Sequence, residues 1–181
     1  MHTPECQFTS YKFKVALKAD IPALEQLVNS AYRGEVSKQG WTTEADLLGG
    51  ERVTAVTLLK DIENPSCCIY ICQYQPGQIN ASVFLQKKED KLYVGMLSVS
   101  PVLQNKGIGK ILLQLADKVA RLNDCTALTM TVISIRTELI AWYNRHGFSL
   151  TGQTFPFDIP GNIVLVKEPL QFVVLEKKLF V

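Results

Sequence analysis

The chain has 181 residues, 47% of them hydrophobic, and 19 basic against 17 acidic side chains leave a formal net charge of +2. This length suits a single domain over residues 1–181 with a real core, and the scattered basic residues give no footprint of a nucleic-acid-binding protein. Because no run of about 18 apolar residues and no signal-like N-terminus occurs, we expect a soluble, cytoplasmic protein without a membrane partner.

The first third of the chain predicts a strand followed by helices. Apolar and basic residues alternate over residues 11–17, which favours a half-buried strand. Asp20 is the expected N-cap of a helix that reaches the polar stretch 34–40. A short helix containing Glu44 should follow, broken by a Gly-Gly pair, and then a further helix over residues 54–62.

Three β-rich runs come next, over residues 67–74, 79–87 and 91–99, and the short turns between them predict an antiparallel meander. Apolar residues at helical spacing from Ile108 to Leu122 predict a long helix. Because this helix is a crossover, the strand before it and the strand after it should run parallel.

The last elements are a strand over residues 128–133, a helix near 137–146 that Gly147 closes, and strands at 148–151 and 171–179. A long loop with prolines joins the final two strands. This order of strands and helices predicts an α/β (α+β) fold, in which a mixed sheet carries helices on its faces.

Cysteine and histidine usage argues against a metal centre and against disulfides. The five cysteines include no Cys-x-x-Cys pair, and an odd number suits reduced thiols. The two histidines, His2 near the N-terminus and His146 near a helix end, are too few to assemble a ligand set. We therefore expect no metal cofactor.

Residues 104–110, Gln-Asn-Lys-Gly-Ile-Gly-Lys, form a glycine-rich turn before the long helix. Glycines let the backbone approach a ligand closely, and the free N–H groups of a helix start attract an anion such as phosphate. A Walker A loop is excluded by Gln104 and Ile111, where that motif needs Gly and Ser or Thr. A dinucleotide fingerprint is weak because Leu112 replaces its third glycine. A turn without a ligand is the alternative.

The pattern Gln-x-x-Gly-x-Gly resembles the pyrophosphate-binding loop of the GNAT superfamily of N-acetyltransferases. The preceding strand ends in Leu97-Ser98-Val99 before a proline-containing loop, and Trp142-Tyr143 is followed after three residues by Gly147-Phe148; both segments are similar to signatures of that family. The resemblance is good over residues 91–150. It implies a mixed, mostly antiparallel central sheet with helices on both faces and a splayed parallel strand pair.

The resemblance also implies a co-substrate, acetyl-coenzyme A, whose pantetheine arm pairs with a strand edge while its pyrophosphate meets the helix start. The N–H near Leu97 would then face the thioester oxygen. Arg136 stands where many members carry Asn, so its contact with the cofactor is open, and the two lysines of the turn equally suit solvated surface charges. The expected cofactor-binding residues are Leu97, Ser98, Val99, Gln104, Asn105, Lys106, Gly107, Ile108, Gly109, Lys110 and Arg136.

Tyr143 is the expected catalytic residue, because the family uses this tyrosine as a general acid that protonates the departing thiolate. Alternatively, Tyr143 is a structural core residue, because its spacing of four from Leu139 places both side chains on the same face of the helix. Many members place a Glu on the strand before the loop, whereas residues 91–99 contain no carboxylate. The candidate bases are water and three carboxylates that also suit helix caps or solvated charges: Glu44, Asp46 and Glu138.

In the family, the acceptor usually enters opposite the coenzyme, between the early helical region and the last strands. Aromatic rings there could line an amphipathic pocket, and a carboxylate could meet an ammonium group, although aromatic residues near Gly and Pro also anchor loops. The expected substrate-binding residues are Tyr32, Trp41, Glu44 and Phe157, with Phe155 and Asp158 as further candidates.

These features predict an N-acetyltransferase that moves an acetyl group from acetyl-coenzyme A to a primary amine of a small molecule or peptide by direct attack in a ternary complex. The alternative is a catalytically degenerate family member that senses acyl-coenzyme A and acts on a partner. A nucleoside-triphosphate-binding protein is disfavoured by the failed Walker motif. The chain would act as a monomer or a homodimer.

Overall fold

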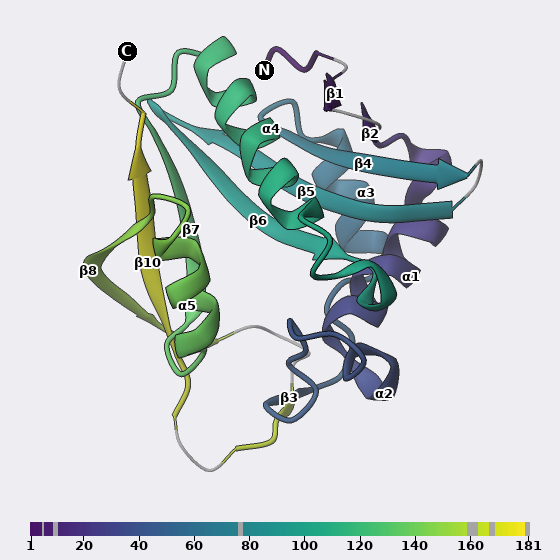
Figure 1. Ribbon diagram of the computed structural model, residues 1–181, viewed down its shortest axis with the longest axis vertical. Coiled ribbons are helices and arrows are strands. Elements are labelled where there is room, and N and C mark those ends of the chain that lie inside the picture. The colour runs from purple at the N-terminus through teal and green to yellow at the C-terminus, as the bar shows by residue number, and fades with distance from the viewer. Residues whose placement is uncertain (5, 9–10, 76–77, 159–162, 167–168, 180–181) are drawn as a thin grey trace.

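The computed structural model describes residues 1–4, 6–8, 11–75, 78–158, 163–166 and 169–179 (Figure 1). Its strands are β1 (Cys6–Phe8), β2 (Tyr11–Val15), β3 (Leu48–Gly49), β4 (Cys67–Gln75), β5 (Gln78–Lys88), β6 (Lys91–Val99), β7 (Ala127–Ile133), β8 (Ser149–Pro156), β9 (Ile163–Val164) and β10 (Gln171–Lys178). Its α-helices are α1 (Ile21–Tyr32), α2 (Gly34–Ser37), α3 (Ala55–Glu63), α4 (Ile108–Leu122) and α5 (Thr137–Asn144), and its short 3-10 helices are η1 (Lys18–Asp20) and η2 (Pro101–Leu103). Every helix in this described part of the chain is too short or too polar to cross a lipid bilayer.

The main sheet has eight strands in the order β1-β2-β4-β5-β6-β7-β10-β8. Neighbouring strands are antiparallel except for β6 and β7, which pair in parallel from Lys91 opposite Ala127 to Tyr93 opposite Thr129. Beyond these residues β6 and β7 diverge, so the sheet opens into a V (Figure 1). The structure thus confirms the mixed, mostly antiparallel sheet, the meander β4–β6 and the splayed parallel pair.

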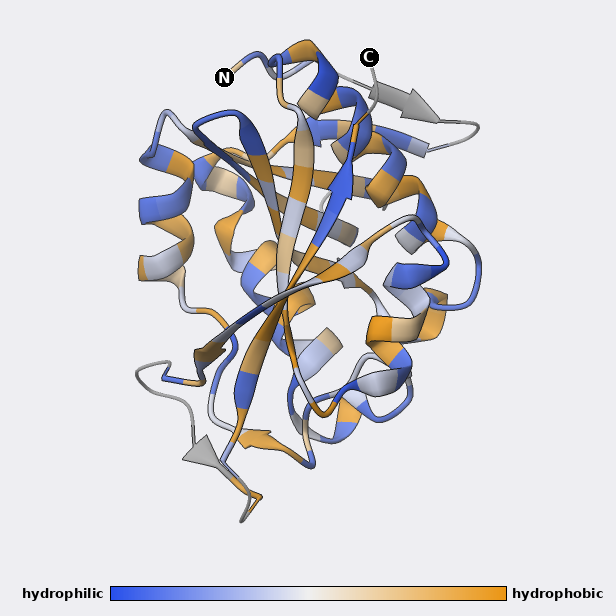
Figure 2. Cartoon of the chain, turned by 90° about the vertical axis from the view of Figure 1, so that its left-hand side faces the viewer, coloured by the Kyte–Doolittle hydropathy of each residue, from blue (hydrophilic) through white to orange (hydrophobic). Residues whose placement is uncertain are grey.

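Helices cover both faces of the sheet and enclose separate cores. Helices α1 and α3 pack on one face of the meander, and α4 packs on the other (Figure 1). Because side chains alternate along a strand, Ile69 and Ile71 of β4 join the α1 core, whereas Tyr70 joins the α4 core. The helices alternate between hydrophilic and hydrophobic residues, as amphipathic helices do (Figure 2).

The region between α1 and α3 does not form the expected helix around Glu44. Residues 45–47 make turns, and Leu48–Gly49 form β3, which pairs with β9. The side chain of Leu48 is buried with Ile133 and Leu170. Pairing with a distant segment and burial of Leu48 therefore outweigh local helix propensity here, while the polar stretch 34–40 contains the short helix α2.

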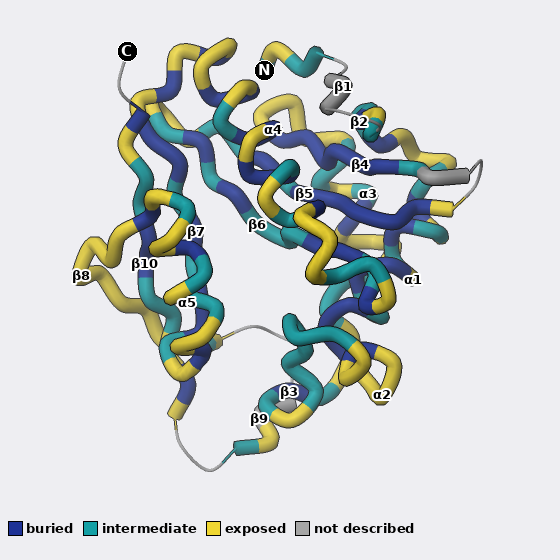
Figure 3. Tube along the Cα trace, viewed as in Figure 1, coloured by how far each residue is buried: buried dark blue, intermediate teal, exposed yellow. Residues whose placement is uncertain are grey.

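Two further expectations need correction, and one strand is additional. Asp20 stands at the N-cap of α1, but its carboxylate accepts bonds from the N–H of Leu17 at 2.9 Å and from Nζ of Lys14 at 3.3 Å, and so closes η1 instead of capping α1. Strand β8 runs to Pro156, beyond the expected end at residue 151, and is exposed along its length (Figure 3). Strand β1 was not expected, because three residues carry too little periodicity to predict a strand.

Replacing Leu115 with Ala tests how much α4 stabilises the fold. Leu115 is fully buried in the core between α4 and the sheet. Truncation removes apolar contacts and leaves a cavity, so we expect the free energy of unfolding, measured by chemical denaturation, to fall by about 3 kcal/mol. Val102→Ala, at an exposed position, should change it by less than about 0.5 kcal/mol. Equal losses in both variants would contradict this core assignment.

Candidate active site

A β-bulge in β6 shapes the centre of the site. The register of β6 against β5 shifts between Ser82 and Phe84, where β6 has an extra residue. Met96 takes a φ of 47°, a region that non-glycine residues rarely adopt. Such a bulge interrupts the ladder and redirects the neighbouring residue, here Leu97, which lines the opening between β6 and β7.

Tyr32, the last residue of α1, anchors this bulge. Its hydroxyl donates a hydrogen bond of 2.6 Å to the carbonyl oxygen of Leu97. Burial raises the pKa of Tyr32 to about 12, so the hydroxyl is still protonated at neutral pH and can keep donating. The bond joins α1 to the bulge and fixes the orientation of the Leu97 carbonyl.

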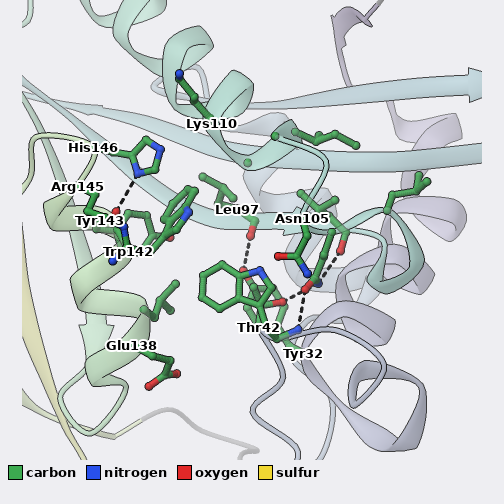
Figure 4. A pocket seen from close by; sticks show the side chains of 18 residues that line it. Tyr32, Thr42, Leu97, Asn105, Lys110, Glu138, Trp142, Tyr143, Arg145 and His146 are labelled. Carbon is green, nitrogen blue, oxygen red and sulfur yellow. Dashed lines mark hydrogen bonds between the residues drawn. The ribbon is translucent and has the colours of Figure 1, made fainter.

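A cavity of about 530 Å³ lies against the glycine-rich turn, and we call it the glycine-turn cavity. Side chains from β6, from α5 and from the loop after α2 converge on it (Figure 4). Ser98, Lys106 and Arg136 are not among its lining residues. The expected cofactor-binding residues that line it are Leu97, Val99, Gln104, Asn105, Gly107, Ile108, Gly109 and Lys110.

The backbone of the turn leaves N–H groups free at this cavity. Gly107, the N-cap of α4, has a φ of 81°, a left-handed conformation that glycine adopts without strain. The N–H of Ile111 bonds to the carbonyl of Gly107 at 3.2 Å and so makes the first turn of the helix. The N–H groups before it have no acceptor within the helix, and the helix dipole favours an anion beside them.

The side chain of Gln104 binds protein groups on both of its ends. Its Oε1 accepts a bond from the N–H of Trp41 at 2.9 Å, and its Nε2 donates to Oγ1 of Thr42 at 2.9 Å and to the carbonyl of Val99 at 3.1 Å. Gln104 therefore ties the loop after α2 to the end of β6. This structural role accounts for a glutamine at the head of the motif.

Trp41 and Trp142 approach each other at the glycine-turn cavity, with ring centroids 6.0 Å apart. The ring of His146 lies 4.2 Å from that of Trp142, and its Nδ1 is 2.8 Å from the Trp142 carbonyl oxygen. A Cβ atom on Gly109 would lie 3.4 Å from the Trp142 ring, so the turn and α5 pack closely. Aromatic rings thus form one wall of the cavity.

A second cavity of about 370 Å³ also reaches the bulge, and we call it the bulge cavity. Polar side chains in it come from separate elements: Glu44, Arg52, Tyr93, Thr131 and Arg136. The residues that line both cavities are Tyr32, Leu97, Leu139 and Tyr143. The cavities therefore meet at the opening between β6 and β7, with the bulge and Tyr143 at their junction.

Tyr143 projects from α5 into this junction and is 8% exposed. Its ring makes edge-on contacts with Trp142, at 5.0 Å between centroids, and with Phe148, at 5.8 Å. Burial raises the pKa of the Tyr143 hydroxyl well above its ordinary value, and the neighbouring Tyr32 raises it further. Tyr143 is consequently a neutral hydroxyl at every physiological pH. Tyr143 therefore packs in the core and also faces both cavities.

Arg136 lies at the bulge cavity and is buried. Its Nε donates to Glu138 at 2.6 Å, and its terminal nitrogens donate to the carbonyls of Trp41 and Thr42, each at 3.4 Å. This ion pair helps to lower the pKa of the Glu138 carboxyl, against the effect of its partial burial. Arg136 thus connects α5 to the loop after α2 on the side away from the glycine-rich turn.

The expected acceptor residues and bases separate in the structure. Glu44 lines the bulge cavity, Trp41 and Glu138 line the glycine-turn cavity, and Tyr32 lines both. Glu44 is paired with Arg33, and Asp46 lies on the surface beside Lys38, at 3.3 Å. The ring of Phe157 packs on Phe172 at 5.0 Å outside both cavities, and Phe155 and Asp158 are exposed.

The remaining polar residues of the bulge cavity were not anticipated. Arg52 comes from the loop before α3, Tyr93 from β6 and Thr131 from β7, and the hydroxyls of Tyr93 and Thr131 share a hydrogen bond of 2.9 Å. No motif or spacing in the sequence marks these three residues, because they come together only in the folded chain. Within the described residues, no group of three His, Cys, Asp or Glu side chains is placed to hold a metal ion.

Comparison with known proteins identifies a family. The family model described as the acetyltransferase (GNAT) family matches residues 22–148. No curated protein sequence matches the chain.

Solved structures share the fold at low sequence identity. The ribosomal-protein-S18-alanine N-acetyltransferase of Escherichia coli superposes with a TM-score of 0.69 at 14% identity, over 93% of this chain and 93% of that one. The ribosomal-protein-alanine N-acetyltransferase of Brucella melitensis gives 0.64 at 18%, over 92% and 99%. A candidate streptothricin acetyltransferase of Bacillus anthracis, solved with acetyl coenzyme A, gives 0.55 at 19%, over 67% of each chain.

The raised pKa of Tyr143 predicts a pH dependence of stability. Below its ordinary pKa of 10.0 the hydroxyl is protonated in the folded and the unfolded chain, so it adds no pH dependence. At higher pH the unfolded chain ionises first, and folding loses about 1.4 kcal/mol per pH unit from this residue.

The measurement compares the unfolding free energies of wild type and Tyr143→Phe by chemical denaturation at several pH values. We expect the unfolding free energy of wild type minus that of Tyr143→Phe to be constant up to about pH 10 and then to fall as the pH rises. A constant difference at all pH values would show that the hydroxyl ionises normally in the folded protein.

Proposed function

The chain belongs to the acetyltransferase (GNAT) family, and on that premise we propose that it transfers an acetyl group from acetyl-coenzyme A to a primary amine. In this proposal residues 1–181 act as a single acetyltransferase domain, with direct attack of the amine in a ternary complex. The observation that supports it best is the junction of the glycine-turn cavity and the bulge cavity at Leu97 and Tyr143. A donor and an acceptor that enter from the two sides would meet there.

The glycine-turn cavity suits acetyl-coenzyme A. The free N–H groups at the start of α4 would bind the pyrophosphate, and Lys110 at the cavity adds a positive charge. The pantetheine arm would lie along the unpaired edge of β6, where Leu97 and Val99 line the cavity, and would replace the missing neighbouring strand. In this pose the thioester lies near the bulge, with the N–H of Leu97 as its expected oxyanion donor.

Tyr143 would act on the departing sulfur. Attack of the amine nitrogen on the thioester carbon forms a tetrahedral intermediate with an oxyanion and a protonated nitrogen. As the C–S bond breaks, Tyr143 donates its proton to the sulfur and takes the proton that the nitrogen loses, which yields the amide and coenzyme A. This exchange fits a hydroxyl whose pKa burial raises, because the phenolate is never released as a free ion.

The amine must be neutral before it attacks, so a base is needed on the acceptor side. Of the described residues that line the bulge cavity, Glu44 is the one carboxylate. Its ion pair with Arg33 holds it beside Tyr32 at the cavity wall. We therefore place Glu44 as the group that receives the ammonium proton, through water, before the chemical step.

Tyr143→Phe tests the proposed general acid. Removing the hydroxyl leaves the ring packing intact, so the Kd for acetyl-coenzyme A should be unchanged. The kcat for acetylation, measured as coenzyme A release with an amine panel, should fall about 100-fold. Tyr11→Phe, at a partly buried tyrosine of β2 outside both cavities, is the matched control and should keep full activity. Unchanged kcat in Tyr143→Phe would remove Tyr143 from the mechanism.

The tryptophan pair offers a direct test of coenzyme binding. Trp41 and Trp142 are the two tryptophans of the chain, and both line the glycine-turn cavity. Acetyl-coenzyme A should therefore produce a saturable change in tryptophan fluorescence, which Trp142→Phe reduces. ATP, a nucleotide without the pantetheine arm, should produce a much weaker response. An equal response to ATP would favour a nucleotide-binding protein, and saturation by acetyl-coenzyme A without acetylation of any amine would favour the sensor alternative.

A further inference from the structure

The charges around the bulge cavity do not balance. Glu44 is paired with Arg33, and Arg136 is paired with Glu138 at 2.6 Å. Arg52 also lines the cavity, and no carboxylate in the described part of the chain lies within ion-pair distance of its guanidinium. The cavity therefore has one positive charge in excess, which an anionic group on a ligand would neutralise.

The position of Arg52 is fixed by α1. Oδ1 of Asn29 accepts the N–H of Arg52 at 2.7 Å, and Nδ2 of Asn29 donates to the carbonyl of Val53 at 3.0 Å. The guanidinium lies over the ring of Tyr32, 5.7 Å from its centroid, and the charge of Arg52 lowers the pKa of Tyr32 against the effect of burial. These contacts preorganise Arg52 at the cavity before any ligand binds.

Tyr32 also sets the separation between Arg52 and the bulge. Its hydroxyl binds the Leu97 carbonyl at 2.6 Å while its ring supports the guanidinium. One aromatic ring therefore separates the anion-binding group from the place where the amine would attack. That separation suits a ligand whose amine and acid group are close to each other, as they are on the same carbon of an amino acid.

The exposed lining of the bulge cavity is somewhat more polar than apolar, and its apolar part comes mainly from β6, β7 and Phe172 of β10. A volume of about 370 Å³ has room for a small molecule rather than for a folded segment of protein. A polycationic acceptor would meet an excess positive charge and a carboxylate already bound to Arg33. Besides Leu97 and Leu139, which line both cavities, the apolar lining residues are Met96, Ile133 and Phe172, together with Val94, Met130 and Val132, whose side chains are buried in the α4 core.

We propose that the acceptor is a small amino acid with an apolar side chain, and that Arg52 binds its carboxylate. This inference rests on the proposed acetyl transfer and names its substrate class. The Arg52 guanidinium donates two charge-assisted hydrogen bonds to the carboxylate, the amine points to Leu97 and Tyr143, and the side chain lies against Met96 and Phe172.

The test compares L-leucine, L-methionine and L-phenylalanine with their carboxamides as acceptors, with coenzyme A release as the readout. The carboxamides have the less basic amines, so more of each is neutral at pH 8, and without recognition of the carboxylate they would react faster. We expect wild type to prefer at least one free acid over its amide by about 10-fold or more in kcat/KM. Amides that react as fast as the acids or faster would overturn the proposal.

Variants locate the recognition at Arg52. Arg52→Gln should lower kcat/KM for the acid by about 30-fold, mainly through KM, and leave the amide little changed, while Arg52→Lys should retain part of the preference. Lys60→Gln removes a charge from an exposed position of α3 and should match wild type. If Arg52→Gln lowers acid and amide alike, Arg52 does not recognise the carboxylate.

A binding experiment separates this inference from the proposed function. Calorimetry with coenzyme A present measures N-acetyl-L-methionine against N-acetyl-L-methioninamide, so it needs no turnover. If wild type binds N-acetyl-L-methionine and Arg52→Gln does not, the carboxylate site is supported even when no amine is acetylated. The absence of acetylation would then count only against the proposed acetyl transfer. Acetylation of amines that lack a carboxylate, with no binding of the N-acetyl acid, would keep the transferase and overturn the amino acid proposal.

Discussion

The short pairing of β6 with β7 is the constraint on which the rest of the site depends. The strands are joined from Lys91 to Tyr93 and then separate, so the edge of β6 near the bulge has no neighbouring strand. Backbone groups at such an edge need partners. The hydroxyl of Tyr32 donates a hydrogen bond to the Leu97 carbonyl. We propose that the amide groups of the coenzyme A arm pair with the remaining backbone groups at this edge of β6. We therefore propose that this gap in the sheet is also the binding site for the coenzyme.

The loop after α2 connects the two sides of this opening. Gln104 holds the loop from the glycine-rich turn, and Arg136 holds the carbonyls of Trp41 and Thr42 from the side of the bulge cavity. Charges there are mostly paired, and the tyrosines at the junction are neutral because they are buried. A charge that develops in such surroundings interacts strongly with the few dipoles aimed at it. Arg52, without an acidic partner in the described residues, is the exception that points to the acceptor.

Local pattern predicted most of the fold, and long-range contacts decided the rest. The apolar residues of α4 recur at helical spacing and turn residues separate the strands of the meander, so these elements were predicted to within a few residues. The pairing of β3 with β9 joins distant segments of two residues each, which no periodicity reveals. Motifs in the sequence singled out the glycine-rich turn and Tyr143 as candidate site residues, whereas Arg52 and Thr131 enter the bulge cavity only when α1, β6 and β7 assemble.

A crystal structure of the protein with acetyl-coenzyme A bound would show directly whether the thioester lies at the opening between β6 and β7. We expect the pyrophosphate at the N–H groups that open α4, the thioester oxygen within hydrogen-bond distance of the Leu97 N–H, and the sulfur facing the hydroxyl of Tyr143. The acetyl group would then point into the bulge cavity. A thioester bound away from the opening between β6 and β7, or an acetyl group closed off from the bulge cavity, would contradict this expectation.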